Sequence, residues 1–135
     1  MHTPHDAKPL PFPVHLKPYW VAHFRSTREQ LRGVFGAPHY VETDSTRTAG
    51  GDEDNWAWEL PTGQRVLIVL AVPYQAARVL SDPPDAEQAV AAVGIDLVEQ
   101  QLQLLAKPFL DPCYSDELPG AVLQNRDERG PCAER

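Results

Sequence analysis

The side chains best suited to chemistry lie in an acidic segment near the middle of the chain. Residues 42–63 hold six acids and one arginine, a net charge of −5 within a total of −7. Oxygen-bearing side chains run without interruption from Asp52 to Asn55, just after Gly50-Gly51. This spacing differs from the alternating pattern with which a calcium loop surrounds its ion. The segment therefore indicates either a solvated loop or a loop whose carboxylates meet Arg and Lys of another protein.

We take the second interpretation as the hypothesis for a partner-binding site. Its residues are Glu42, Asp44, Asp52, Glu53, Asp54 and Trp56. Trp56 shares one face of an expected strand with Trp58. Two indoles on one face either pack in a core or, if left uncovered, form an anchor for a partner.

His23 and His39 support a rival hypothesis, a small enzyme or ligand-binding domain. Imidazoles beside carboxylates such as Glu42 or Asp44 can form an acid–base pair or a two-histidine metal site. Their spacing matches no motif, and the chain shows no nucleophile elbow, phosphate-binding glycine loop or dinucleotide fingerprint. We therefore assign no catalytic residue, cofactor or metal, and favour a function other than catalysis.

The net negative charge of the chain limits the classes of partner that it can bind. An acidic chain is poorly suited to bind nucleic-acid phosphates, whereas a basic protein is attracted to it. No secretory signal or membrane-length apolar run is seen, so we expect a cytoplasmic protein that does not contact membranes. Cys113 and Cys132 lie in a polar stretch without a CxxC pair, where we expect reduced thiols, although a disulfide between them stays open.

A hairpin at residues 55–72 shows how the domain is built. The first arm, 55–60, alternates apolar and polar residues, as expected of a strand with one wet face. The second arm, 65–72, is apolar at every position from Val66 onward, which is typical of a strand covered on both faces. A turn of two or four residues centred on Thr62-Gly63 would place Trp58 opposite Leu67, and a three-residue loop would shift that register.

Three helices are expected. Ser26 and Glu29 match a capping box that opens a helix ending at Phe35. Asp85 can cap a second helix, Ala86 to Val93. A third should start at Asp96, because an amphipathic stripe of four residues follows at steps of four, three and four. The stripe consists of Val98, Leu102, Leu105 and Phe109.

The 14 prolines divide the chain. Five of them fall within residues 1–18, which we expect to form an extended arm. Residues 19–110 should form a single domain, and 111–135 a polar, flexible tail. Tyr19 to Phe24 could be a short strand or a docking segment.

We predict an α+β domain with three or four antiparallel strands and helices packed on the sheet. The expected strands are 39–43, 55–60, 65–72 and 77–81. Because 65–72 is apolar on both sides, helices should cover both faces, or one face should be a contact in a homodimer.

Part of the chain resembles a known layout. Residues 31–38, Leu-Arg-Gly-Val-Phe-Gly-Ala-Pro, are followed by a polar loop, then by Trp56-Ala57-Trp58 and by Gly63 to Val69. This is similar to the helix, turn and two strands of small outer-membrane assembly lipoproteins and β-lactamase-inhibitor-like modules. The resemblance spans residues 31–69 and implies a helix laid on an antiparallel sheet used for protein binding. The printed residues show no signal peptide and no lipid-attachment cysteine near the start, so we do not expect the envelope role of the lipoproteins.

The chain also looks like the immunity proteins of bacterial toxin systems, which are small, acidic and cytosolic. The sequence thus favours a non-enzymatic protein-binding module, in its sharpest form an immunity-type inhibitor of a basic toxin. The alternatives are the histidine-based enzyme or ligand-binding domain and a self-assembling structural subunit.

Overall fold

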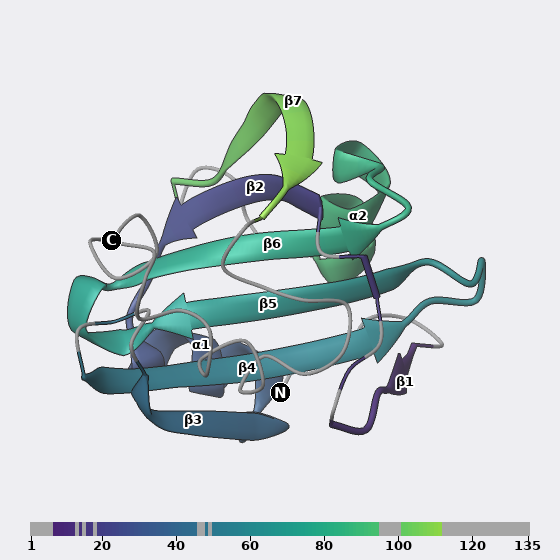
Figure 1. Cartoon of the computed structure of the whole chain (residues 1–135). Helices are drawn as coiled ribbons and strands as arrows, with labels where there is room; N and C mark the ends of the chain where they lie inside the picture. Colours follow the sequence, from purple (N-terminus) through teal and green to yellow (C-terminus); the bar gives the residue numbers. More distant parts are fainter. Residues whose placement is uncertain are drawn as a thin grey trace.

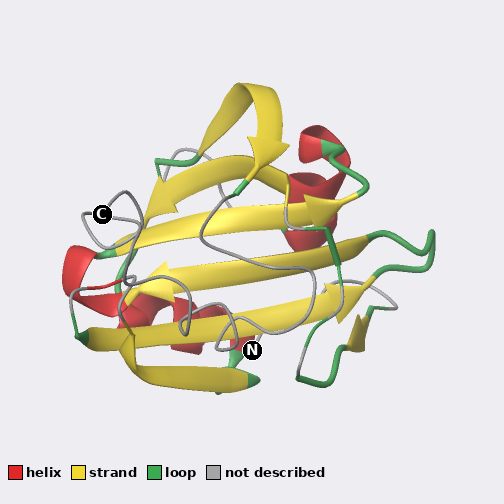
Figure 2. Cartoon of the chain, in the orientation of Figure 1, coloured by secondary structure: helices red, strands yellow, loops and turns green. Residues whose placement is uncertain are grey.

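The computed structural model describes residues 7–12, 14, 16–17, 19–45, 48, 50–94 and 101–111 (Figures 1 and 2). The strands are β1 (Lys8–Pro9), β2 (Tyr19–Arg25), β3 (Tyr40–Ser45), β4 (Gly51–Glu59), β5 (Arg65–Ala71), β6 (Ala76–Asp82) and β7 (Gln103–Leu110). The helices are α1 (Arg28–Phe35), α2 (Ala86–Val93) and a 3₁₀ turn, η2 (Val72–Tyr74).

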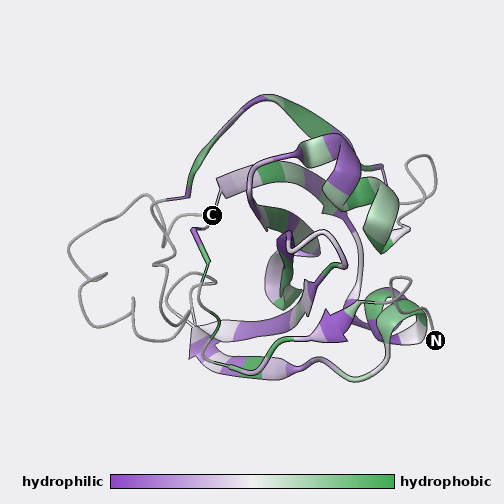
Figure 3. Cartoon of the chain, turned by 90° about the vertical axis from the view of Figure 1, so that its right-hand side faces the viewer, coloured by the Kyte–Doolittle hydropathy of each residue, from purple (hydrophilic) through white to green (hydrophobic). Residues whose placement is uncertain are grey.

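The seven strands form one antiparallel sheet, in the order β1-β4-β5-β6-β2-β7. β3 also pairs with β4, so β1 and β3 share the same edge of β4. The sheet is strongly curved, as the end view in Figure 3 shows. The predicted α+β fold with a three- or four-stranded sheet is therefore wrong. The four expected strands are present, but β1, β2 and β7 extend the sheet, and strands dominate the described residues.

β5 is the centre of the sheet and is buried on both faces, as its continuous apolar sequence predicted. Val66, Ile68 and Leu70 point into the larger core. Leu67 and Val69 point to the opposite side. We call these the inner and outer faces of the sheet.

Both helices lie on the inner face. Leu31 and Phe35 of α1 and Val90 and Val93 of α2 belong to the same core as Trp56 and Trp58. The ring of Phe35 lies 5.1 Å from that of Trp58, between centroids. The expectation that helices cover both faces is wrong.

The proline-rich arm covers the outer face instead. Val14 and Leu16 are 2% and 4% exposed and pack with Leu67, Val69 and Leu80. The amide of Leu10 donates to the carbonyl of Ala57 at 2.9 Å, which fixes the arm along β4. An extended chain has enough apolar side chains to bury this face, so no second helical layer is needed.

The hairpin has the register of the three-residue alternative, and not the register expected for a loop of two or four residues. Trp58 pairs with Val66, not with Leu67. The loop has three residues, because the amide of Leu60 donates to the carbonyl of Gln64 and Gly63 has a φ of 89°. A three-residue hairpin loop needs a residue with positive φ at its end, and glycine adopts this conformation without strain.

The first helix begins one residue later than predicted, with Thr27 as its N-cap. Thr27 Oγ1 accepts from the amide of Gln30 at 3.1 Å, and Gln30 Oε1 accepts from the amide of Thr27 at 3.0 Å. The capping box therefore consists of Thr27 and Gln30, not of Ser26 and Glu29. The helix ends at Phe35 as expected, and α2 has the predicted bounds and the predicted cap, Asp85.

The prediction of a third helix is wrong for residues 103–110, because these residues form strand β7. Gln103 pairs with His23 and Leu110 with Tyr19, with an irregular register between them. Pro108 lies inside the segment, and proline in a helix interior removes a hydrogen bond and clashes with the preceding turn. The start of that expected helix, and Cys113 and Cys132 of the expected tail, lie outside the described residues.

Candidate functional site

The acidic segment does not form one surface, because β4 sends successive side chains to opposite faces. Asp54 points to the inner face and has no exposed surface. Its carboxylate accepts hydrogen bonds from Arg28 at 2.9 and 2.8 Å and from Arg32 at 3.1 Å. Burial alone would raise the pKa of Asp54, but the two guanidinium groups outweigh it and hold the pKa below its usual value. Asp54 thus anchors α1 to the sheet.

Glu53 points to the outer face and is equally buried. Its carboxylate lies 3.9 Å from the guanidinium of Arg78. Glu42, directly across the β3–β4 pair, is 7% exposed and accepts a hydrogen bond from Tyr40 at 2.9 Å. These two carboxylates are part of the interior of the molecule.

The predicted partner-binding residues are therefore mostly inaccessible. Trp56 is fully buried, with its indole N–H donating to the carbonyl of Gly36 at 3.2 Å. Only Asp44 and Asp52 reach solvent, and Asp52 pairs with Arg28 at 3.1 Å. The structure does not bring the six residues together as a docking surface.

The two histidines are also far apart. His23 belongs to β2, and His39 immediately precedes β3, so β6, β5 and β4 separate them. His39 packs edge-on against Trp58, and its Nδ1 accepts from the amide of Ala57 at 3.0 Å. Burial lowers the pKa of His39, which favours the neutral ring that this hydrogen bond requires. Among the residues that the structure describes, no three His, Cys, Asp or Glu side chains are grouped as metal ligands.

The accessible features lie at the other end of the sheet, beside β7. A groove runs between β7 and the start of α2, with mainly apolar walls. They include Pro83, Pro84, Ala86, Leu104, Leu105 and Pro108. Asp85 and Glu87, both exposed, also line it. We call this feature the β7–α2 groove.

β7 itself is unusually exposed for a strand with large apolar residues. Leu104, Phe109 and Leu110 are 41%, 45% and 54% exposed. Within the described part of the chain β7 pairs only with β2, so its other side is an edge. Phe109 packs against Trp20 on the outer face, with 5.4 Å between ring centroids, whereas Leu104 lines the groove. An exposed apolar residue on an edge strand beside an apolar groove indicates an interaction site.

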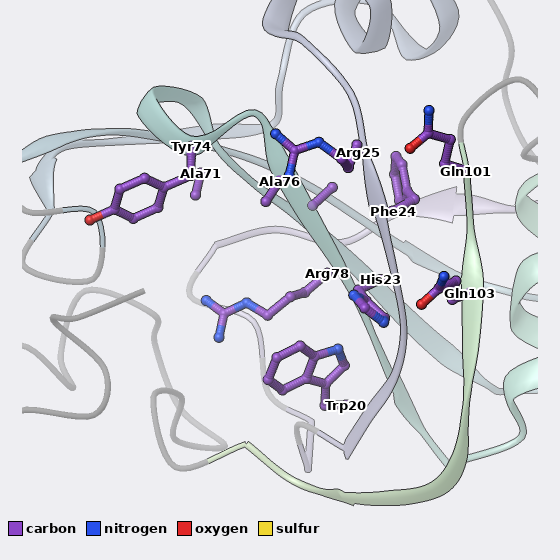
Figure 4. A pocket seen from close by; sticks show the side chains of 11 residues that line it. Trp20, His23, Phe24, Arg25, Ala71, Tyr74, Ala76, Arg78, Gln101 and Gln103 are labelled. Carbon is purple, nitrogen blue, oxygen red and sulfur yellow. The ribbon is translucent and has the colours of Figure 1, made fainter.

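A second cavity, of about 370 Å³, opens on the outer face where β2, β6 and the start of β7 meet (Figure 4). Its polar walls include His23 and Arg25 of β2 and Arg78 of β6, and the ring of Trp20 lies beside them. We call this feature the outer pocket. Sequence reasoning missed both features. The signal for the pocket was the alternation of His23 and Arg25 with Phe24 in an aromatic segment, which indicates a strand with a polar face.

No known protein family, curated protein or solved structure matches this chain. In the described residues, neither helix is long and apolar enough to cross a membrane.

Proposed function

We propose that the chain is a non-enzymatic protein-binding module, and that its docking surface is the β7–α2 groove. The observation that carries this proposal is the mainly apolar wall of that groove beside the edge strand β7, in which Leu104 is 41% exposed. Isolated exposed apolar residues are common on protein surfaces, but Leu104 belongs to a groove that other leucine and proline side chains also line, which fits a recognition site.

The occupant that fits the groove is a segment with an apolar anchor and basic flanking residues. Asp85 and Glu87 are the charged residues of its walls, and the whole chain carries a net charge of −7. Complementary charge speeds encounter and selects the partner, while apolar contact in the groove supplies most of the affinity.

Recognition should depend on side chains more than on strand addition. Pro108 has no backbone N–H to offer a new strand, and Lys107 is exposed in the same strand. Prolines, lysines and irregular registers are devices that protect edge strands from pairing with other chains. The partner is therefore expected to insert an apolar side chain between β7 and α2.

The sharpest form of the proposal is an immunity-type inhibitor of a basic bacterial toxin, acting in the cytoplasm. The acidity and small size of the chain support this form. It differs from the expectation from sequence in where the toxin would dock, because Glu53 and Asp54 are enclosed within the sheet.

Peptides of defined sequence test the proposal. Random peptides displayed on phage are selected against the full chain, and one selected peptide is titrated against purified variants by fluorescence anisotropy. We expect selected peptides to be basic with one or two large apolar residues. Their binding should weaken as salt rises from about 0.05 to about 0.5 M, because screening reduces charge attraction.

The chain offers a matched pair of variants. Glu87 and Glu29 are both exposed acids in the first turn of an eight-residue helix. Glu87→Lys should weaken peptide binding about tenfold, and Glu29→Lys should leave it unchanged. Equal effects of the two variants, or selection of acidic peptides, would refute the groove as the site. If the chain self-associates in sedimentation experiments and no peptide is selected, this result would support the structural-subunit alternative instead.

A further inference from the structure

We propose that the outer pocket binds a small organic anion that carries a flat aromatic ring. The pocket is separate from the β7–α2 groove, so this inference does not depend on the proposed docking function. Its cavity of about 370 Å³ is within the range that encloses small ligands.

The charged residues in the walls of the outer pocket favour a negatively charged ligand. Arg25, Arg78 and His23 line the pocket, and none of the described lining residues is an aspartate or glutamate. The amide groups of Gln101 and Gln103 add further donors at the β7 side. A ligand carboxylate would meet several N–H donors and no competing negative charge in the wall.

Several of these donors are available. The side chains of His23, Arg25 and Gln103 make no hydrogen bond or ion pair with another residue that the structure describes. His23 and Gln103 lie on paired positions of β2 and β7, so the two side chains enter the pocket from adjacent strands. Unpaired polar groups that converge on a cavity are the usual mark of a binding site.

The aromatic wall is held rigidly. The indole N–H of Trp20 donates to the carbonyl of Ala22 at 2.9 Å. The guanidinium of Arg78 lies 5.4 Å from the centre of the Trp20 ring, and the ring of Phe109 packs against it at 5.4 Å between centroids. Arg78 is itself fixed by Asp111 at 2.6 Å and lies near the buried Glu53. A ring fixed before binding loses little entropy when a flat ligand stacks on it.

Arg78 and Arg25 therefore have different roles in the outer pocket. Asp111 and Glu53 already balance the charge of Arg78, so this residue mainly positions Trp20. Arg25, which is exposed at the mouth of the pocket, supplies the uncompensated positive charge. The anionic group of the ligand should therefore lie toward Arg25 and His23, and its ring toward Trp20.

Two probes of equal shape test this inference, 2-naphthoate and its uncharged counterpart 2-naphthamide. The indole N–H signals of the full, ¹⁵N-labelled chain are followed by NMR during titration. Trp20 should respond with a saturable shift, whereas Trp56 and Trp58, buried on the inner face, act as internal controls. We expect the amide to bind about tenfold more weakly than the carboxylate, since it lacks the charge-assisted hydrogen bonds.

Arg25→Gln should weaken naphthoate binding about tenfold and leave naphthamide binding unchanged. Lys107→Gln removes the same charge from an exposed residue of β7 that does not line the pocket, and should change neither. The proposal is overturned if naphthoate causes no saturable shift of Trp20, if all three indoles shift together, if both probes bind equally, or if the two variants behave alike.

Discussion

Arg28 holds the carboxylate of Asp54 through two hydrogen bonds, from Nε at 2.9 Å and from Nη2 at 2.8 Å. The two partners differ in their surroundings. The side chain of Asp54 has no exposed surface, whereas those of Arg28 and Arg32 are 31% and 40% exposed. The residue that sequence reasoning assigned to a partner is thus the internal attachment point of α1.

This asymmetry predicts unequal costs of removing the two sides. Asp54→Asn leaves two arginines that water can hydrate, and should lower the free energy of unfolding by about 1–2 kcal/mol. The double variant Arg28→Gln, Arg32→Gln leaves a buried carboxylate without compensation, and should cost about 3–5 kcal/mol. Urea denaturation measures both.

The control for this comparison is Arg65→Gln. Arg65 pairs with Asp82 at 2.7 Å, but both side chains are partly exposed, at 34% and 21%. Such a pair should contribute about 1 kcal/mol or less. A larger cost for Asp54→Asn than for the double arginine variant would contradict the assignment of Asp54 as the buried partner.

The same pair should make the fold sensitive to acid. The pKa of Asp54 in the folded chain is below its ordinary value of 3.8, so the unfolded chain takes up the proton first as pH falls. The stabilisation is complete above that ordinary value and is lost as pH falls through the lower, folded value. The difference in unfolding free energy between the wild type and Asp54→Asn should therefore stay constant down to about pH 5 and shrink as the pH falls further toward about 2. A difference that is independent of pH would show that Asp54 is not ionised in the fold.

Two glycines should respond to alanine in opposite directions. A methyl group on Gly51 would overlap the ring of Pro73, where β4 begins beside η2. Gly51→Ala should therefore destabilise the chain by about 1–3 kcal/mol. Gly33 lies in α1 with open space around it, and Gly33→Ala should stabilise by about 0.5–1 kcal/mol, because alanine favours the helix. Chemical denaturation of both variants checks the signs, and two changes of the same sign would count against this packing.

The arm should contribute to stability as part of the core. Leu16 is 4% exposed on the outer face, and Leu16→Ala should cost about 2–3 kcal/mol. Leu110→Ala, at a leucine that is 54% exposed, should change stability by less than about 0.5 kcal/mol. Thermal or urea unfolding distinguishes the two, and an equally small cost at Leu16 would mean that the arm does not cover β5.

Local sequence patterns were sufficient to predict the structure at the centre of the fold. The continuous apolar run of β5 predicted burial on both faces, and Asp85 and Gly94 correctly marked the ends of α2. These features depend on residues close together in the chain. The hairpin register depends on the loop length, and the structure has the three-residue loop given as the alternative, with Gly63 at positive φ, in place of a loop of two or four residues.

Long-range partners could not be predicted in this way. The spacing of Leu102, Leu105 and Phe109 fits a helix, but pairing with β2 decides the structure of β7. The acidic segment looked like a surface, because the sequence does not show that Arg28, Arg32 and Arg78 come from distant elements to neutralise it. The β7–α2 groove and the outer pocket likewise depend on which strands become neighbours.

Mapping of backbone amide signals tests the central claim, that binding occurs at the β7–α2 groove and not at the acidic segment. The full ¹⁵N-labelled chain is titrated with a selected basic peptide. We predict shifts at Asp85, Glu87, Leu104 and Leu105, which line the groove, with Asp44 and Asp52 unchanged. Shifts confined to Asp44, Asp52 and their neighbours in β3 and β4 would contradict the claim.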